Sequence, residues 1–356
     1  MNPKLSAFIR KIPHTSFVVL YGNNEIIRSG DVHYPFHQSS DFLYLTGINS
    51  PGIVLSIFWD EIIIWREPIS EKEKIWWHNK WDDAKITNIS GITDIRDTGG
   101  LELYFSKFQN FLLKEEFYLP IVHNLRIIKT PDEIQKIQKV VRITKEIFSH
   151  IQKNGHPWMY EYEIEAMIAY QFRLHQGVEA FPTIVASGPN SCILHYIQNN
   201  RKMNAGDVVL LDFGIEIDGY GADISRTFSI SWEFSPRQKV IYDAVLDVKT
   251  FSEQILQPWI SRKEWNMRVK NYMWEICQKL NLPNIEKHTS QENPYFPHSI
   301  GHFLWLDTHD VGDIDTIFQP GMIVTIEPGI YIVDESIGIR IEDDYLITES
   351  GCEMIS

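Results

Sequence analysis

The sequence predicts a mixed α/β (α+β) protein of two domains, residues 1–122 and 123–356. Three observations support this prediction. Short apolar segments bounded by turn residues fill the first third of the chain, helical periodicity begins near residue 130, and two later segments resemble each other in sequence. The length of 356 residues also favours two cores over one, because domains usually hold about 100–200 residues. We therefore expect a small N-terminal α/β domain followed by a larger domain with pseudo-two-fold symmetry.

The N-terminal region contains strand-like segments separated by turns. Residues 16–21 form an apolar run that ends at Gly22, and residues 53–57 follow Pro51-Gly52. Residues 61–65 have the β-branched enrichment of a buried strand. A helix is expected over residues 102–114.

Helix start signals mark the larger domain. Thr130-Pro-Asp-Glu133 combines an N-cap residue, a proline at the first helical position and a glutamate three residues after the cap. Apolar residues then recur at helical spacing as far as Gly155. Further helices are expected over residues 161–176, 235–257 and 261–280. The helices thus come in two pairs, and each pair precedes two strand-like segments: 206–217 with 222–230, and 321–332 with 338–347.

An acidic residue occupies the same place in each half of this domain. Asp212 and Glu327 each follow a glycine by six positions and precede Gly-Ile-x-Ile by two, within otherwise apolar runs. Asp223 and Glu342 stand on the returning segments. A buried carboxylate costs several kcal/mol unless it is compensated. One such acid could face solvent or pair with Arg226 or Arg340, but four in matching positions indicate bound cations.

Histidines near these acids suggest further ligands. His298, His302 and His309 fall within one segment, and His195 lies in an earlier one. The His-x-x-x-His spacing lacks the glutamate of a zincin helix. Four carboxylates and one imidazole are hard ligands that favour Mn²⁺, with Co²⁺ or Zn²⁺ as alternatives. They suit two ions about 3.5–4 Å apart, an arrangement that serves hydrolysis.

Composition excludes several classes of function. A formal net charge of −14 argues against binding to a nucleic-acid backbone. No apolar run approaches the roughly 20 residues that cross a bilayer, and residues 1–12 lack the apolar stretch of a signal peptide. The three cysteines show no metal-type spacing and suit a reducing compartment. We expect a cytoplasmic protein.

Five residues follow one another in an order that resembles the pita-bread metallopeptidases: Asp212, Asp223, His302, Glu327 and Glu342. The motifs around the two glutamates, Glu-Pro-Gly-x-Tyr and Arg-Ile-Glu-Asp, strengthen the resemblance. Residues 34–47 are similar to part of the N-terminal domain of Xaa-Pro aminopeptidases (aminopeptidase P). Their sequence is Tyr-Pro-Phe-His-Gln-Ser-Ser-Asp-Phe-Leu-Tyr-Leu-Thr-Gly. The resemblance implies a creatinase-like N-terminal domain and a pita-bread catalytic domain.

The resemblance also implies a role for each residue. Asp212 would chelate one metal ion, Asp223 and Glu342 would bridge both, and His302 and Glu327 would hold the other. Glu327 would also carry a proton from the attacking water to the leaving nitrogen. Further catalytic roles would fall to His309 at the scissile carbonyl, to His195 and His298 beside the substrate, and to Arg340, which would order the site.

The implied reaction releases the N-terminal residue from peptides with proline in second position. The implied assembly is a homodimer or homotetramer, for which the Trp76-Trp77 pair is one candidate interface. Two positions depart from the family pattern. Trp305 stands where the family has glycine, which suggests a reshaped substrate channel, and His37 replaces an arginine of the N-terminal motif.

Several alternatives remain open. A prolidase, which cuts only Xaa-Pro dipeptides, shares both domains and all five ligands. Methionine aminopeptidases normally lack the N-terminal domain, and creatinase lacks the metal ligands. A catalytically inactive peptide-binding protein of the same fold is the alternative outside the enzymes.

Overall fold

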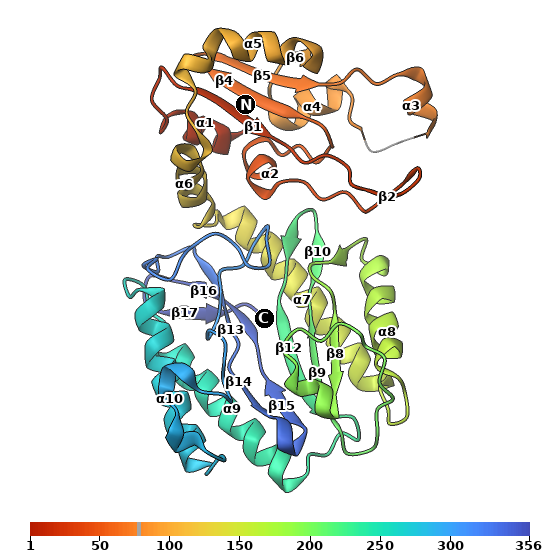
Figure 1. The fold of residues 1–356 in the computed structure, drawn as a ribbon, viewed down its shortest axis with the longest axis vertical. Coiled ribbons are helices and arrows are strands. Elements are labelled where there is room, and N and C mark those ends of the chain that lie inside the picture. The colour runs from red at the N-terminus through yellow and green to blue at the C-terminus, as the bar shows by residue number, and fades with distance from the viewer. Residues whose placement is uncertain (77–79) are drawn as a thin grey trace. The chain divides into compact units, whose positions relative to one another are not determined.

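A computed structural model describes residues 1–76 and 80–356 of the chain, so Trp77 lies outside the described residues. The chain divides into two compact units, Met1–Arg126 and Ile127–Ser356. The boundary expected between residues 122 and 123 falls inside helix α6 (Glu115–Arg126). Each unit combines helices and sheets (Figure 1), which confirms the predicted mixed class.

The N-terminal unit is built on a four-stranded sheet in the order β1-β4-β5-β6. The three predicted strands are present as β1 (Phe17–Tyr21), β4 (Val54–Phe58) and β5 (Glu61–Arg66). Sequence reasoning missed β6 (Asp94–Asp97), a polar segment that pairs parallel to β5. The remaining elements are α1 (Pro3–Ile9), β2 (Ile27–Ser29), β3 (Val32–His33), α2 (Ser40–Thr46), α3 (Glu71–Trp76), α4 (Asp83–Ser90), α5 (Leu101–Phe108) and α6.

Helix α5 is shorter than the predicted helix over residues 102–114. After Phe108 the chain makes a short 3₁₀ turn, and the Leu113 N–H then donates to the Phe17 carbonyl beside the sheet. Competition from this strand partner ends the helix early. The aromatic rings of Tyr104 and Phe108 pack on Phe17 and so tie α5 to the sheet.

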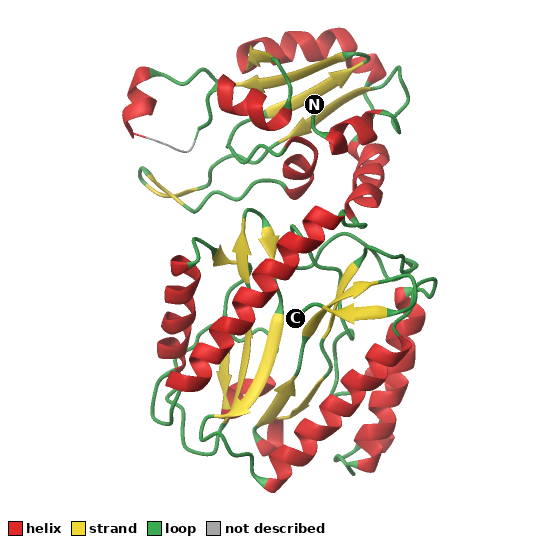
Figure 2. Cartoon of the chain, turned by 180° about the vertical axis from the view of Figure 1, so that it is seen from behind, coloured by secondary structure: helices red, strands yellow, loops and turns green. Residues whose placement is uncertain are grey.

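All four predicted helices of the C-terminal unit are confirmed, with ends within a few residues of those expected. The capping boxes at Thr130 and Ser235 are formed. Seen from behind in Figure 2, the long helices lie across the strands of this unit. The helices are α7 (Pro131–Asn154), α8 (Glu161–Leu174), α9 (Pro236–Ile255) and α10 (Arg262–Lys279).

The strands of the C-terminal unit form two similar sets, one in each half. In the first half β9 pairs antiparallel with β12, and the chain beyond β9 continues as β10, which pairs with β11. In the second half β13 pairs with β16, and β14 pairs with β15. The strands are β7 (Val178–Glu179), β8 (Ile184–Ser187), β9 (Val208–Phe213), β10 (Ile215–Ile217), β11 (Tyr220–Gly221), β12 (Ile224–Ser229), β13 (Ile323–Ile326), β14 (Gly329–Ile332), β15 (Ile337–Arg340), β16 (Asp343–Ile347) and β17 (Cys352–Met354).

Each half therefore has the same order of elements: two helices, an outgoing segment divided into two strands, and a returning segment divided into two strands. This order agrees with the predicted pseudo-two-fold symmetry. Across the described residues, no helix is long and apolar enough to cross a membrane.

Candidate active site

A cavity of about 440 Å³ opens in the C-terminal unit. All the residues predicted as ligands or catalytic groups line it: His195, Asp212, Asp223, His298, His302, His309, Glu327, Arg340 and Glu342. Arg262, which the sequence had not singled out, also lines this cavity.

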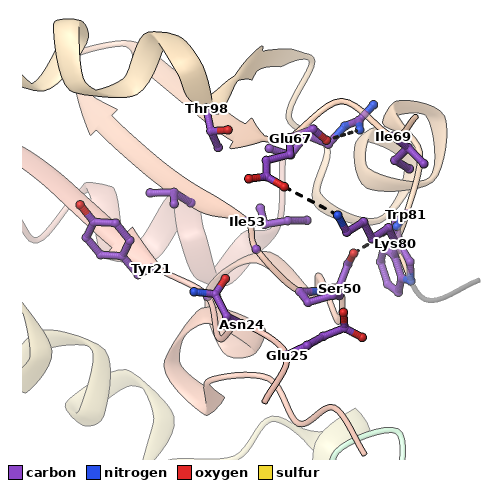
Figure 3. Close-up of a pocket in the computed structure, with 15 residues that line it drawn as sticks. Tyr21, Asn24, Glu25, Ser50, Ile53, Glu67, Ile69, Lys80, Trp81 and Thr98 are labelled. Carbon is purple, nitrogen blue, oxygen red and sulfur yellow. Dashed lines mark hydrogen bonds and ion pairs between the residues drawn. The ribbon is translucent and has the colours of Figure 1, made fainter. Parts of the chain in front are cut away.

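A second cavity, of about 410 Å³, lies within the N-terminal unit (Figure 3). Tyr21, Glu67 and Lys80 lie on its wall, with Lys80 Nζ 3.7 Å from Glu67 Oε2. Its described lining residues include no His, Cys or Asp, so its chemistry differs from that of the C-terminal cavity.

The acids of the second half stand where paired strands change partners. Glu327 lies between β13 and β14, and Glu342 lies opposite it between β15 and β16. Pro328 has no N–H to continue a ladder, so the chain leaves one strand pair and joins another at this point. Both carboxylates consequently project from an interrupted sheet.

The first half makes the same break at Gly214. A Cβ at this position would come within 1.6 Å of the Ala222 carbonyl oxygen, so only glycine lets the two segments cross so closely. Asp212 lies near the end of β9, and Asp223 lies between β11 and β12. The duplicated motif therefore brings two acids from each half to one cavity.

His302 is held against β13 by backbone contacts. Its N–H donates to Thr325 Oγ1, and its carbonyl accepts from the Thr325 N–H at 2.9 Å. Gly301 makes this approach possible, because a Cβ there would lie 2.0 Å from the Thr325 oxygen. The imidazole Nε2 then lies 3.4 Å from Asp223, 3.7 Å from Glu327 and 4.0 Å from Glu342.

The arrangement leaves His302 Nε2 free to act as a ligand. Its Nδ1 lies 3.0 Å from the Phe303 carbonyl oxygen. Since a carbonyl only accepts, Nδ1 carries the proton and the Nε2 lone pair faces the carboxylates. A backbone carbonyl commonly fixes metal-binding histidines in this way.

The buried carboxylates fit divalent cations. Asp223, His302 and Glu342 offer ligand atoms that all lie within 4.8 Å of one another. Asp212 Oδ1 and Glu342 Oε1 are buried without a hydrogen-bond partner. Burial and the neighbouring Asp212 raise the pKa of Asp223 well above its usual range, and burial and Asp223 do the same to Glu342. A cation would relieve this repulsion and satisfy the unpaired oxygens.

Arg340 places a positive charge directly beside these acids. Its guanidinium is buried and lies 2.6 Å from Asp212 Oδ2. Its Nε–H donates to Ser225 Oγ at 2.7 Å, and that hydroxyl donates to Glu342 Oε2 at 2.8 Å. Arg340 thus orients one acid directly and another through Ser225.

A third donor of Arg340 reaches His298 through Tyr331. Arg340 Nη1 donates to the Tyr331 oxygen, which lies 3.0 Å from His298 Nε2. The Nδ1–H of His298 donates to the Ser299 carbonyl, so Nε2 accepts from the tyrosine hydroxyl. Burial, together with Arg340, lowers the pKa of His298 to about 3, which keeps this ring neutral.

The other predicted histidines, His195 and His309, are exposed residues of the cavity lining. The ring centroid of His309 is 4.2 Å from that of His302. Partial burial and His302 lower the pKa of His309 to about 4, so it is neutral at physiological pH. His195 is exposed on the loop that follows β8.

Neither of the two residues that depart from the family pattern is among the described residues that line this cavity. Trp305 is buried, at 1 % exposure, and does not line the cavity, so the expected reshaping of the channel is not seen within the described chain. Instead it packs near Tyr220 and lies under Lys129 Nζ. His37 is exposed in the N-terminal unit, where its carbonyl accepts from Asn23.

Comparison with known proteins agrees with this geometry. Residues 135–349 match the family described as metallopeptidase family M24, and residues 3–113 match the aminopeptidase P N-terminal domain. The chain is 30% identical to an Xaa-Pro aminopeptidase of Escherichia coli, over 98% of this chain and 92% of that protein. It is 31% identical to an Xaa-Pro aminopeptidase of Haemophilus influenzae, over 96% of this chain and 90% of that protein.

A solved structure of Zn-substituted E. coli aminopeptidase P in complex with product is similar over 99% of this chain and 93% of that chain. The TM-score is 0.90 at 29% sequence identity. This likeness supports the predicted architecture of an N-terminal α/β domain and a pita-bread domain.

Proposed function

The chain belongs to metallopeptidase family M24 and is a hydrolase, and we propose that it uses two divalent metal ions to hydrolyse Xaa-Pro peptide bonds. The reaction releases the N-terminal residue from peptides with proline in second position. The observation that carries the proposal is the group of buried carboxylates around His302 Nε2. The names of its relatives support the choice of substrate.

Five side chains would hold the ions. Asp212 would hold one ion, His302 and Glu327 would hold the other, and Asp223 and Glu342 would serve both. The oxygen-rich set favours Mn²⁺, with Co²⁺ or Zn²⁺ as alternatives. When bound, the ions supply Lewis acidity that acidifies water and polarises a carbonyl.

The chain's own groups move the protons and bind the substrate. Glu327 accepts a proton from the attacking water and delivers it to the leaving nitrogen; burial raises its pKa, as a proton carrier requires. His309 donates a hydrogen bond to the scissile carbonyl oxygen as charge develops there. His195 and His298 contact the substrate, and Arg340 holds Asp212 in place.

Proline explains why such a bond needs its own enzyme. Its nitrogen has no N–H for a general peptidase to bind, and its ring fixes φ. Like the nitrogen of any peptide bond, the proline nitrogen must still take up a proton as it leaves, and Glu327 delivers that proton.

The test uses purified protein stripped of metal and reloaded with Mn²⁺. Its activity is measured on Xaa-Pro dipeptides, Xaa-Pro-Yaa tripeptides and Xaa-Ala-Yaa controls. We expect metal-dependent cleavage of the proline tripeptides. Absence of cleavage of any proline peptide by the metal-loaded protein refutes the proposal, and cleavage of dipeptides alone favours the Xaa-Pro dipeptidase alternative.

We also propose a cytoplasmic homodimer or homotetramer. All three cysteines are free thiols, which is typical of a reducing compartment. Exposed apolar side chains such as Trp76 in the N-terminal unit offer surface for a second copy. Light scattering measures the assembly, and cell fractionation locates it.

A further inference from the structure

Arg262 is a cation in the cavity that the proposed mechanism does not use. It occupies the first turn of α10, directly after the N-cap Ser261, and lines the same cavity as Glu327 and His302. Its Nη2 donates to the Gly301 carbonyl at 3.0 Å, next to the predicted ligand His302.

The guanidinium lacks the partner that other buried arginines have. Every other arginine that is buried or partly buried in the described chain has a carboxylate oxygen within 2.7 Å: Arg66, Arg96, Arg126, Arg201, Arg226, Arg237 and Arg340. Among the described residues, no carboxylate lies within ion-pair distance of Arg262, and its buried Nε–H has no hydrogen-bond partner.

This arrangement costs free energy. Desolvation lowers the pKa of Arg262, and the more distant Glu327 and Asp313 offset only part of that effect. Arg262 Cζ lies 5.8 Å from the centroid of the Phe303 ring, but a partly buried charge without a carboxylate partner still destabilises a fold unless another molecule supplies one. The free N–H groups of a guanidinium match the two oxygens of a carboxylate in geometry and charge.

We propose that Arg262 binds the C-terminal carboxylate of a short leaving fragment, either proline itself or a Pro-Yaa dipeptide. The inference rests on the proposed function, since it assigns the leaving side of the peptide to the wall formed by Arg262 and Gly301. Peptides that end one or two residues after the cleaved bond place their carboxylate inside the cavity. Arg262 therefore selects short substrates with a free C-terminus.

The test compares each free peptide with its C-terminal amide, which differs in charge but hardly in size. The Mn²⁺-loaded protein is assayed on Ala-Pro and Ala-Pro amide, and on Ala-Pro-Ala and Ala-Pro-Ala amide. We expect kcat/KM to favour the acid in at least one pair by roughly ten- to hundredfold, the range of a hydrogen bond to a charged group.

Three variants assign the preference to the side chain. Arg262→Met should remove the preference and leave amide hydrolysis within about twofold, and Arg262→Lys, which keeps the charge without the fork, should retain part of it. Lys263→Met is the matched control, because Lys263 carries the same charge one residue along but is 70% exposed beside Asp315. It should behave like the unmodified protein.

Calorimetry of product binding gives a second readout that does not require turnover. The metal-loaded protein should bind Pro-Ala more tightly than Pro-Ala amide, and Arg262→Met should bind both equally. Equal treatment of acid and amide in every pair would overturn the Arg262 assignment, as would a preference that survives Arg262→Met. Failure to cleave any proline peptide would refute the peptidase proposal instead, while the calorimetric comparison would still decide the role of Arg262.

Discussion

His302 and Arg340 contact the same group of carboxylates in opposite ways, His302 with a neutral ring nitrogen and Arg340 with a charged guanidinium. His302 presents a lone pair, because the Phe303 carbonyl holds its other nitrogen as a donor. Arg340 presents three donors and uses them on Asp212, Ser225 and Tyr331. One side chain thus leaves room for a cation, and the other fixes the acid that would bind it.

Replacement of Glu342 by glutamine should remove metal binding without changing the shape of the site. Glu342→Gln keeps the volume but loses the charge and one strong ligand oxygen. We expect metal content per chain to fall and kcat/KM to drop about a hundredfold or more, since even the loss of a group that hydrogen-bonds to a metal ligand typically costs 10–100-fold. Elemental analysis and peptide assays measure both. Glu335→Gln, in an ion pair with Arg237 outside the cavity, is the control, and equal effects in both variants would contradict the assignment.

Loss of the Tyr331 hydroxyl should uncouple Arg340 from His298. Tyr331→Phe leaves a donor of Arg340 and the acceptor of His298 unpaired in a buried site. We expect unfolding to become easier by about 1–3 kcal/mol, together with a fall in activity. Denaturant titration measures the loss. Tyr295→Phe, whose hydroxyl bonds the Pro283 carbonyl at the surface, should cost less than about 1 kcal/mol, and a similar cost in both variants would argue against a special role for Tyr331.

At the scale of elements, α8 holds the loop that carries His195. Glu161, in the first turn of α8, is fully buried and accepts from Ser187 at the end of β8. Its other oxygen accepts from the Tyr196 hydroxyl and the Arg201 N–H. A single carboxylate therefore joins the start of the helix to both ends of the loop.

Removal of this carboxylate should loosen the loop. Glu161→Ala leaves several buried donors unpaired, and we expect a loss of about 2–4 kcal/mol in the free energy of unfolding. Because His195 lies on this loop, KM for Xaa-Pro peptides should rise more than kcat falls. Glu165→Ala, one turn along the same helix, is the control. A uniform fall in kcat with unchanged KM would show that the loop does not position His195 for binding.

The sequence predicts these elements to different extents. Capping boxes and apolar spacing gave the long helices, because those signals are local to each helix. The acids were found because a repeated motif marked them twice. Strand β6 is polar, and α6 contains Pro120, so neither carried a local signal. The sequence predicts continuous strands through Gly214 and Pro328, where the structure has changes of strand partner, although the proline itself is a signal for the break.

The parts of the site that the sequence does not predict share one property. The contacts of Arg262 and Glu161 depend on segments distant in the sequence, which only the packed fold brings together. Tyr331 was visible in the Glu-Pro-Gly-x-Tyr motif, but nothing in the spacing indicated that it joins Arg340 to His298. Local patterns therefore predict which residue types carry the chemistry better than they predict which residues position them.

At the scale of the molecule, the C-terminal unit concentrates negative charge where its two halves meet. The pKa values of Asp223, Glu327 and Glu342 are all raised by burial, and carboxylates from both halves contribute to the shifts. Protons or cations that neutralise these acids therefore stabilise the folded state. This links metal binding, pH and stability in one measurable relation.

The gap in unfolding free energy between metal-loaded and metal-free protein should widen as pH rises from about 4, the pKa of a carboxyl group in the unfolded chain, toward the raised pKa of these carboxyl groups in the fold. The pKa of these carboxyl groups is higher in the fold than in the unfolded chain, where it is about 4. At a pH between the two pKa values, the folded chain therefore binds more protons than the unfolded chain. The contribution of these groups to stability falls as pH rises through that window. The metal-free protein loses this contribution, whereas cations replace the protons in the loaded protein. His298, whose pKa burial lowers to about 3, is neutral in the metal-free and the metal-loaded fold alike, so its effect cancels in the difference between the two forms. Burial raises the pKa of three cysteines to about 11: Cys192, Cys277 and Cys352. As pH rises they lower the stability of both forms alike, so the difference between the forms cancels their effect.

Chemical denaturation with Mn²⁺ and with a chelator measures the gap at each pH. In Glu342→Gln the gap should shrink and lose most of its pH dependence, and a gap that stays constant in the unmodified protein would show that these carboxylates do not bind the ions.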